Sequence, residues 1–179
     1  MALILLDMDG VLTDFAAGVC KLFGKKPPGS DDRGRSVAEV AGINPGLMWR
    51  RIDEAGARFW SELEPTPFAN ELVTMCRKVG EVVIATSPSS DPGAAAGKVA
   101  WLQRRFGKRF RDFAITPRKE LLAAPGRLLI DDTPKHVDAF RAAGGAAVLV
   151  PTWANGELES EATVLAPIEA ALAALQENT

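Results

Sequence analysis

The chain has 179 residues, of which 47 % are hydrophobic and 25 % charged, and its formal net charge is −2 at pH 7. This is the balance of a globular domain of ordinary size, with room for a modest insertion. A net charge this close to zero offers no overall attraction to nucleic acid or to an anionic membrane. No hydrophobic run approaches the roughly 18 residues of a membrane span, so we expect no membrane partner. The N-terminus lacks the basic and apolar regions of a signal peptide, and we therefore expect a cytoplasmic protein.

The inventory of reactive side chains excludes several chemistries. His136 is the only histidine in the sequence, which rules out a multi-histidine zinc site and argues against a Ser-His-Asp triad. We interpret it as a structural residue in the first turn of a surface helix. Cys20 and Cys76 each fall in a helical pattern, and two isolated cysteines of this kind are expected to be buried thiols.

The first fifteen residues combine a short strand with paired carboxylates. Residues 3–6 are all aliphatic, a pattern typical of a strand that is buried on both faces of a parallel sheet. Asp7 and Asp9 follow at alternate positions, and Gly10 comes next. Ligands of open α/β sheets bind outside the carboxyl ends of the strands, so this turn is a candidate for chemistry. A strand that ends in an ordinary polar turn is the alternative for this motif taken alone.

Residues 14–64 contain helical patterns and no strand pattern. Apolar residues at helical spacing predict a helix from Asp14 to Phe23, with Asp14 as its N-cap. Residues 30–35 are polar and loop-like, and residues 47–63 predict a second helix that breaks near Gly56. A helical insertion at this place in the chain would stand over the carboxyl ends of the strands. The segment Glu-Pro-Thr-Pro at 64–67 is stiff and extended, and it would return the chain to the sheet.

The remainder of the chain alternates helices with strands. Strands are predicted at residues 82–85, 113–115, 128–130 and 146–150. Helices are predicted at residues 68–79, from Asp91-Pro92 to about residue 106, after Thr133-Pro134, and at residues 164–175. A basic run lies at the end of the second of these helices and beyond it: Arg104, Arg105, Lys108, Arg109 and Arg111. Such a run is more often a solvated face, and without interleaved aromatic residues we do not expect a nucleic-acid partner.

Polar side chains follow three of these strands in the same way as the first. Thr86 and Ser87 end one strand, Lys119 lies just beyond the next, and Asp131-Asp132 end the last. Parallel strands joined by right-handed crossovers share one carboxyl edge. We therefore predict a three-layer, Rossmann-like α/β fold whose edge gathers four carboxylates, two hydroxyls and one ammonium group. Because unpaired like charges are costly to bury, such a cluster indicates a site that a metal or a ligand completes.

The order of these motifs resembles the four-part signature of the haloacid dehalogenase-like superfamily, and in particular its phosphatases. A narrower set is similar to the 5′(3′)-deoxyribonucleotidases, over a stretch from about Ala2 to Lys135. This set comprises Asp7–Phe15, Phe59–Pro65, Thr86–Pro88, Lys98 with Trp101, and Leu128–Asp132. The resemblance implies a small helical cap inserted after the first strand. We expect residues 14–64 to form this cap and residues 1–13 and 65–179 to form the α/β catalytic core.

The resemblance also implies a Mg²⁺-dependent phosphomonoester hydrolase that works through an aspartyl-phosphate intermediate. Asp7 would be the nucleophile that attacks phosphorus. Asp9 would protonate the leaving alkoxide and then deprotonate the hydrolytic water. The branch of the superfamily that cleaves carbon–halogen bonds lacks this second aspartate, so the presence of Asp9 favours phosphoryl chemistry.

Hard oxygen ligands suit Mg²⁺, and the sequence supplies them in the carboxylates of Asp7 and Asp131. By the resemblance, the backbone carbonyl of Asp9 would be the third metal ligand, and the substrate phosphate would be the fourth. Thr86, Ser87 and Lys119 would bind the phosphate, with Lys119 also balancing the charge that develops during transfer. Asp132 would lie outside the ligand set and orient Lys119 or a metal-bound water.

The substrate is the part of the prediction with the most alternatives. Phe15 and Trp60 fall on motif positions where aromatic side chains of the deoxyribonucleotidases surround base and sugar, although both could simply pack the cap. The expected partner is a small phosphomonoester, with a nucleoside monophosphate first. Residues 33–37 and Pro117 depart from the family pattern. A sugar phosphate or a ribonucleotide is therefore an alternative substrate. A polynucleotide-end phosphatase and a non-catalytic binding module are weaker alternatives, since no predicted catalytic group is missing; a homodimer is compatible with the sequence.

Overall fold

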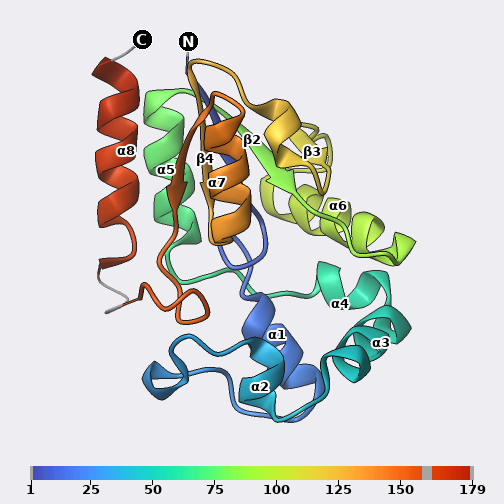
Figure 1. Ribbon diagram of the computed structural model, residues 1–179. Helices are drawn as coiled ribbons and strands as arrows, with labels where there is room; N and C mark the ends of the chain where they lie inside the picture. Colours follow the sequence, from blue (N-terminus) through green and yellow to red (C-terminus); the bar gives the residue numbers. More distant parts are fainter. Residues whose placement is uncertain (1, 159–162, 178–179) are drawn as a thin grey trace.

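The computed structural model describes residues 2–158 and 163–177 and places a parallel β-sheet at the centre of the molecule (Figure 1). Within these residues the sheet has five strands in the order β3-β2-β1-β4-β5. The strands are β1 Leu3–Leu6, β2 Glu81–Thr86, β3 Phe113–Ile115, β4 Arg127–Asp131 and β5 Ala146–Leu149. Every pairing is parallel, and Leu6 at the end of β1 pairs with Ile84 and with Ile130. The predicted sheet and its shared carboxyl edge are confirmed.

Helices cover both faces of the sheet, which gives the three predicted layers (Figure 1). Their bounds are α1 Phe15–Leu22, α2 Val37–Ala41, α3 Pro45–Ala55, α4 Ala57–Ser61, α5 Ala69–Val79, α6 Pro92–Phe106, α7 Pro134–Ala142 and α8 Ala166–Glu177, with 3₁₀ turns η1 Ser30–Asp32 and η2 Lys119–Leu122. Alternate residues of the strands face opposite layers, as strand geometry requires. Ile4 and Leu6 belong to the larger core with α5 and α8, whereas Leu5 packs with Phe140 of α7. Among the described residues, no helix is both long and apolar enough to cross a bilayer.

Local signals in the sequence placed most helix ends correctly. Asp14 is the N-cap of α1, since its Oδ1 accepts a hydrogen bond from the Ala17 N–H at 2.9 Å. The predicted break near Gly56 separates α3 from α4. Pro92 begins α6 as predicted, and Asp91 precedes it as the N-cap residue, although its side chain makes no capping hydrogen bond. The short helix α2 was not predicted; it begins at a reciprocal capping pair between Ser36 and Glu39.

Residues 14–64 leave the sheet and return to it at the same place. The Asp14 N–H donates to the Glu64 carbonyl at 2.8 Å, and the Thr66 N–H donates to the Leu12 carbonyl at 3.1 Å. This segment holds α1 to α4 and lies beyond the carboxyl edge of the sheet (Figure 1). Its division from the rest of the chain as a separate cap stays a prediction.

One part of the insertion is packed tightly on the α/β core. A Cβ added to Gly97 of α6 would lie 2.3 Å from the Ala57 carbonyl oxygen of α4, well inside van der Waals contact. Only glycine therefore allows these two helix backbones to approach so closely. The approach brings Trp60 of α4 against α6 and fixes it over the carboxyl edge of β2.

Candidate active site

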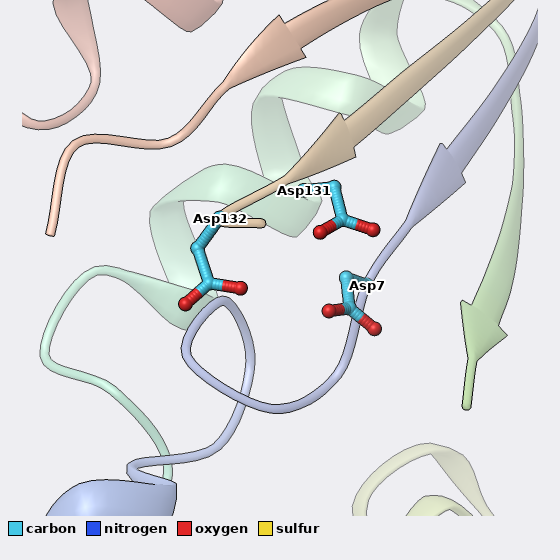
Figure 2. A group of neighbouring side chains, drawn as sticks. All are labelled: Asp7, Asp131 and Asp132. Carbon is cyan, nitrogen blue, oxygen red and sulfur yellow. The ribbon is translucent and has the colours of Figure 1, made fainter. Parts of the chain in front are cut away.

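Three aspartates meet where β1 and β4 end. Asp7 follows β1, and Asp131 and Asp132 lie at the end of β4, with their carboxylates close to one another (Figure 2). One carboxylate oxygen from each lies within 4.8 Å of the others. The Asp7 N–H donates to the Ile130 carbonyl at 2.9 Å, so the ladder between the two strands sets the spacing of the cluster.

The turn after Asp7 depends on Gly10. This residue has a φ of +80°, a conformation that L side chains rarely adopt. A Cβ at this position would also lie 2.2 Å from Oδ2 of Asp132. Gly10 therefore lets the chain turn close against the carboxylate of Asp132.

Lys119 is buried between two of the carboxylates. Its Nζ lies 2.6 Å from Oδ1 of Asp7 and 2.6 Å from Oδ2 of Asp131, and only 1 % of the side chain is exposed. Although burial opposes the charged form, these two carboxylates raise the pKa of Lys119 above its usual value. The ammonium thus compensates part of the negative charge of the cluster.

Lys119 does not compensate all of the negative charge of the cluster. Burial raises the pKa of Asp7 to about 6, even with Lys119 acting in the opposite direction. Burial and the neighbouring charges of Asp7 and Asp131 also raise the pKa of Asp132 well above its usual range. Two neighbouring carboxylates whose pKa values are raised in this way favour the arrival of a further cation.

His136 lies in the first turn of α7, as the sequence predicted, and it contacts the cluster. Its Nδ1 lies 3.2 Å from Oδ2 of Asp131. Burial alone would raise the pKa of Asp131, but His136 and then Lys119 outweigh that effect and lower it. The Thr133 N–H also donates to Oδ1 of Asp131 at 2.9 Å, so this carboxylate is held in place by contacts from three residues.

Asp9 points to a different partner from the other aspartates. Its Oδ2 accepts a hydrogen bond from Nζ of Lys98, and its Oδ1 accepts one from Oγ1 of Thr13 at 3.1 Å. Lys98 is fully buried in α6, donates to Oγ1 of Thr86 at 2.8 Å, and lies 4.7 Å from the ring centroid of Trp60. Lys98 therefore contacts Asp9, Thr86 at the end of β2, and Trp60 of the insertion.

Sequence reasoning gave Lys98 no role beyond its place in the family resemblance. The signal was nevertheless available, because Lys98 lies four residues after Ala94 and four before Leu102, on the buried stripe of α6. A lysine is almost never fully buried unless it is paired. Its position on that stripe therefore called for a buried anionic partner.

Thr86 and Ser87 lie at the end of β2, at the same edge as the aspartates. Oγ1 of Thr86 accepts from Lys98, which leaves the hydroxyl proton of Thr86 to be donated elsewhere. Ser87 lines the cavity described below, and its hydroxyl donates to the Thr116 carbonyl at 3.4 Å. The structure thus brings all the polar residues predicted for the site to one edge.

A cavity of about 1070 Å³ opens over this edge. Asp7, Asp9 and Asp132 lie among its lining residues, and aromatic side chains complete part of its wall: Phe15, Trp49, Trp60, Phe68 and Trp153. The Phe15 and Trp60 rings stack with centroids 5.7 Å apart and an interplanar angle of 21°. The sequence predicted Phe15 and Trp60 at this place, but it did not predict that Trp49 and Trp153 share the cavity.

Comparison with known proteins places this arrangement in a family. Residues 1–165 match the family described as 5′ nucleotidase, deoxy (pyrimidine), cytosolic type C protein. The chain belongs to this family. The resemblance to the deoxyribonucleotidases that the sequence motifs predicted is confirmed.

Curated members of the family are about one third identical to the chain. The mitochondrial 5′(3′)-deoxyribonucleotidase of Mus musculus is 36 % identical over 143 residues, and that of Homo sapiens is 34 % identical over 142 residues. Each alignment covers 73 % of this chain, and they cover 64 % and 62 % of the two relatives. The chain therefore matches less than two thirds of the length of these proteins. The cytosolic-type 5′(3′)-deoxyribonucleotidase of Homo sapiens is 32 % identical over 141 residues, which cover 72 % of this chain and 69 % of the relative.

Solved structures support the same fold. A haloacid dehalogenase-like family hydrolase from Xanthomonas campestris superposes with a TM-score of 0.57, covering 100 % of this chain and 95 % of that one. A hydrolase from Streptococcus pneumoniae gives a TM-score of 0.54, with 84 % and 93 % covered. Both are 15 % identical to this chain, so they confirm the predicted haloacid dehalogenase-like fold and carry no argument about substrate.

Proposed function

We propose that the protein is a Mg²⁺-dependent phosphomonoester hydrolase, and specifically a 5′(3′)-deoxyribonucleotidase that removes phosphate from nucleoside monophosphates. The observation that carries this proposal is the group of Asp7, Asp131 and Asp132 around Lys119 at the base of an aromatic-lined cavity. Membership of a family whose curated members are deoxyribonucleotidases supports the substrate class.

The carboxylate cluster fits a hard divalent cation. Its donors are all oxygens, which Mg²⁺ prefers, and the raised pKa values of Asp7 and Asp132 support the uptake of further positive charge. The carboxylates of Asp7 and Asp131 and the backbone carbonyl of Asp9 would hold the ion. Asp132, beside them, would orient Lys119 or a metal-bound water. When bound, the ion would neutralise the charge of the phosphate.

The chain's own residues would carry the two chemical steps. A carboxylate oxygen of Asp7 attacks phosphorus, the bond from phosphorus to the ester oxygen breaks, and an aspartyl-phosphate forms. Asp9 gives its proton to the departing alkoxide and later takes one from the water that hydrolyses the aspartyl-phosphate. Lys119, Thr86 and Ser87 hold the phosphate oxygens. Lys98 aligns Asp9 and Thr86, since it contacts both.

The cavity supports a substrate larger than a simple phosphate ester. Its volume of about 1070 Å³ lies at the upper end of ordinary ligand sites. Planar aromatic walls suit a nucleobase. A sugar phosphate is the second candidate, because the polar residue Ser36 also lines the cavity. A non-catalytic module has no support, since every predicted catalytic side chain is present at the edge. The cytoplasmic location and a homodimer stay predictions.

The substrate class is tested by phosphate release from a panel that contains nucleoside 5′- and 3′-monophosphates of both sugars, glycerol 2-phosphate and hexose phosphates, each with Mg²⁺. We expect kcat/KM to be highest for a nucleoside monophosphate. A higher kcat/KM for the hexose phosphates would replace the nucleotide assignment with the second candidate.

Removal of the metal is expected to abolish activity reversibly. Exhaustive dialysis against EDTA should eliminate phosphate release, because a dianionic ester would then face a carboxylate cluster whose charge Lys119 compensates only in part. Adding Mg²⁺ should restore the initial rate, whereas Zn²⁺ should restore it poorly at a site without His or Cys ligands. Undiminished turnover after chelation, with residual metal measured as negligible, would contradict the proposal.

Trp60→Ala is expected to destabilise the fold. The side chain is 2 % exposed, stacks on Phe15, and covers the ammonium of Lys98. Truncating a buried tryptophan costs about 3–5 kcal/mol of unfolding free energy, measurable by chemical denaturation. Trp49→Ala, at a side chain that is 42 % exposed in the same insertion, is the matched control and should cost much less. A Trp60→Ala variant of wild-type stability with a raised KM for nucleotides alone would show that Trp60 contributes only to the substrate wall.

A further inference from the structure

The loop that follows β5 is held rigidly against the active site. Asn155 organises it: its Nδ2 donates to the Asp132 carbonyl at 3.0 Å and to the Val150 carbonyl at 2.8 Å. Its Oδ1 accepts from the backbone N–H groups of Thr152 at 3.0 Å and Glu157 at 3.1 Å. The side chain of Asn155 thus satisfies its full hydrogen-bonding capacity. It ties residues 151–157 to the backbone of the carboxylate cluster.

The same loop is joined to the insertion. The Gly34 N–H donates to the Trp153 carbonyl at 2.7 Å, and Nε of Arg33 donates to the Gly156 carbonyl at 2.6 Å. These two bonds link residues more than a hundred positions apart in the sequence. Both are accepted by backbone carbonyls of the loop, so neither uses the side chain of Trp153.

The indole ring of Trp153 is the part of the loop that the hydrogen bonds described above do not involve. Among the described residues, it makes neither a hydrogen bond nor a contact with another aromatic ring, and it is only half-buried. It lines the cavity together with Asp7, Asp9 and Phe15. A large aromatic side chain on a loop that hydrogen bonds hold in place, lining the same cavity as the aspartates, is a feature of ligand recognition.

We propose that Trp153 is a specificity-determining residue whose indole packs against the nucleobase of a nucleoside monophosphate bound at Asp7. Phe15 and Trp60 approach the cavity from the insertion, and Trp153 would join Phe68 in supplying an aromatic contact from the core side. The bonds of Arg33 and Gly34 to the loop would keep the two sides together around the base. This inference rests on the proposed function and names the part of the substrate that the loop recognises.

Steady-state kinetics of three variants test the inference. Trp153→Ala removes the ring, Trp153→Phe keeps an aromatic face, and Leu121→Ala is a control at an apolar side chain that is 64 % exposed and outside the cavity. Each is assayed with a nucleoside monophosphate and with glycerol 2-phosphate, which has no base. Thermal unfolding of each variant checks that the fold is intact.

We expect Trp153→Ala to raise KM for the nucleotide roughly 10- to 100-fold, the range that loss of one stacked base implies. Its kcat, its kcat/KM for glycerol 2-phosphate and its unfolding midpoint should stay close to wild type. Trp153→Phe should recover most of the loss, and Leu121→Ala should change nothing.

Results of two kinds would overturn the inference: one concerns Trp153 alone, and the other concerns the proposed substrate. Equal losses of Trp153→Ala on both substrates, or no loss on the nucleotide, would show that Trp153 is not a base contact while the nucleotidase assignment stands. Wild-type protein that hydrolyses glycerol 2-phosphate but no nucleoside monophosphate would instead remove the proposed substrate, and the role of Trp153 with it.

Discussion

Asp7→Asn is expected to lower kcat by roughly 10⁴-fold or more, the order of loss when a covalent nucleophile is removed. The amide has nearly the same shape as the carboxylate, but it cannot attack phosphorus. The fold should persist, because burial already disfavours the charge of Asp7 and raises its pKa to about 6. Phosphate release and thermal unfolding of the purified variant measure both effects.

The matched control for Asp7→Asn is Asp138→Asn on α7, at a side chain that is 77 % exposed. It makes the same chemical change far from the site and should leave both activity and stability unaltered. If Asp7→Asn retained substantial turnover, beyond the slow return of Asp by deamidation, Asp7 would not be the nucleophile.

Lys98→Met should have the second largest effect. Methionine fills a similar volume but offers no hydrogen bonds, so Asp9 and Thr86 would lose the ammonium that aligns them. General acid–base catalysis contributes typically 10²–10⁴-fold, and we expect a loss in this range in kcat/KM for a nucleoside monophosphate. An aryl phosphate with a good leaving group should lose less, because its departing oxygen needs little help from a proton.

Comparing the two esters distinguishes a role of Lys98 in aligning Asp9 and Thr86 from a role in stabilising the fold. Arg105→Met removes a positive charge from the exposed side of the same helix and should be without effect on either ester. Should Lys98→Met lose the same factor on both esters and also unfold at a lower temperature, Lys98 would be a structural residue only.

The sequence was informative wherever a property is local. Short apolar runs predicted the strands of the sheet, and the polar residues that follow them predicted the site edge, because parallel strands joined by crossovers end at a common side. The N-cap at Asp14 and the break at Gly56 are likewise set by one or two neighbouring residues. These features need no knowledge of how distant segments pack.

The parts that escaped prediction depend on distant contacts. The pairing of Lys98 with Asp9 joins residues 89 positions apart, and it requires α6 to pack with Lys98 toward the ends of β1 and β2. Trp153 lies in a loop whose shape comes from the side chain of Asn155 and not from any periodic pattern. Hydrophobic periodicity carries no information about either contact.

The role of Asp7 as the acceptor of the phosphoryl group is tested most directly by trapping the intermediate. Enzyme mixed with Mg²⁺ and its best nucleoside monophosphate is quenched in acid within the first turnovers, and its peptides are then analysed by mass spectrometry. We predict phosphorylation of the N-terminal peptide at Asp7, with none in Asp7→Asn. Rapid turnover without any phosphorylated peptide, at quench times that resolve a single cycle, would contradict the covalent mechanism.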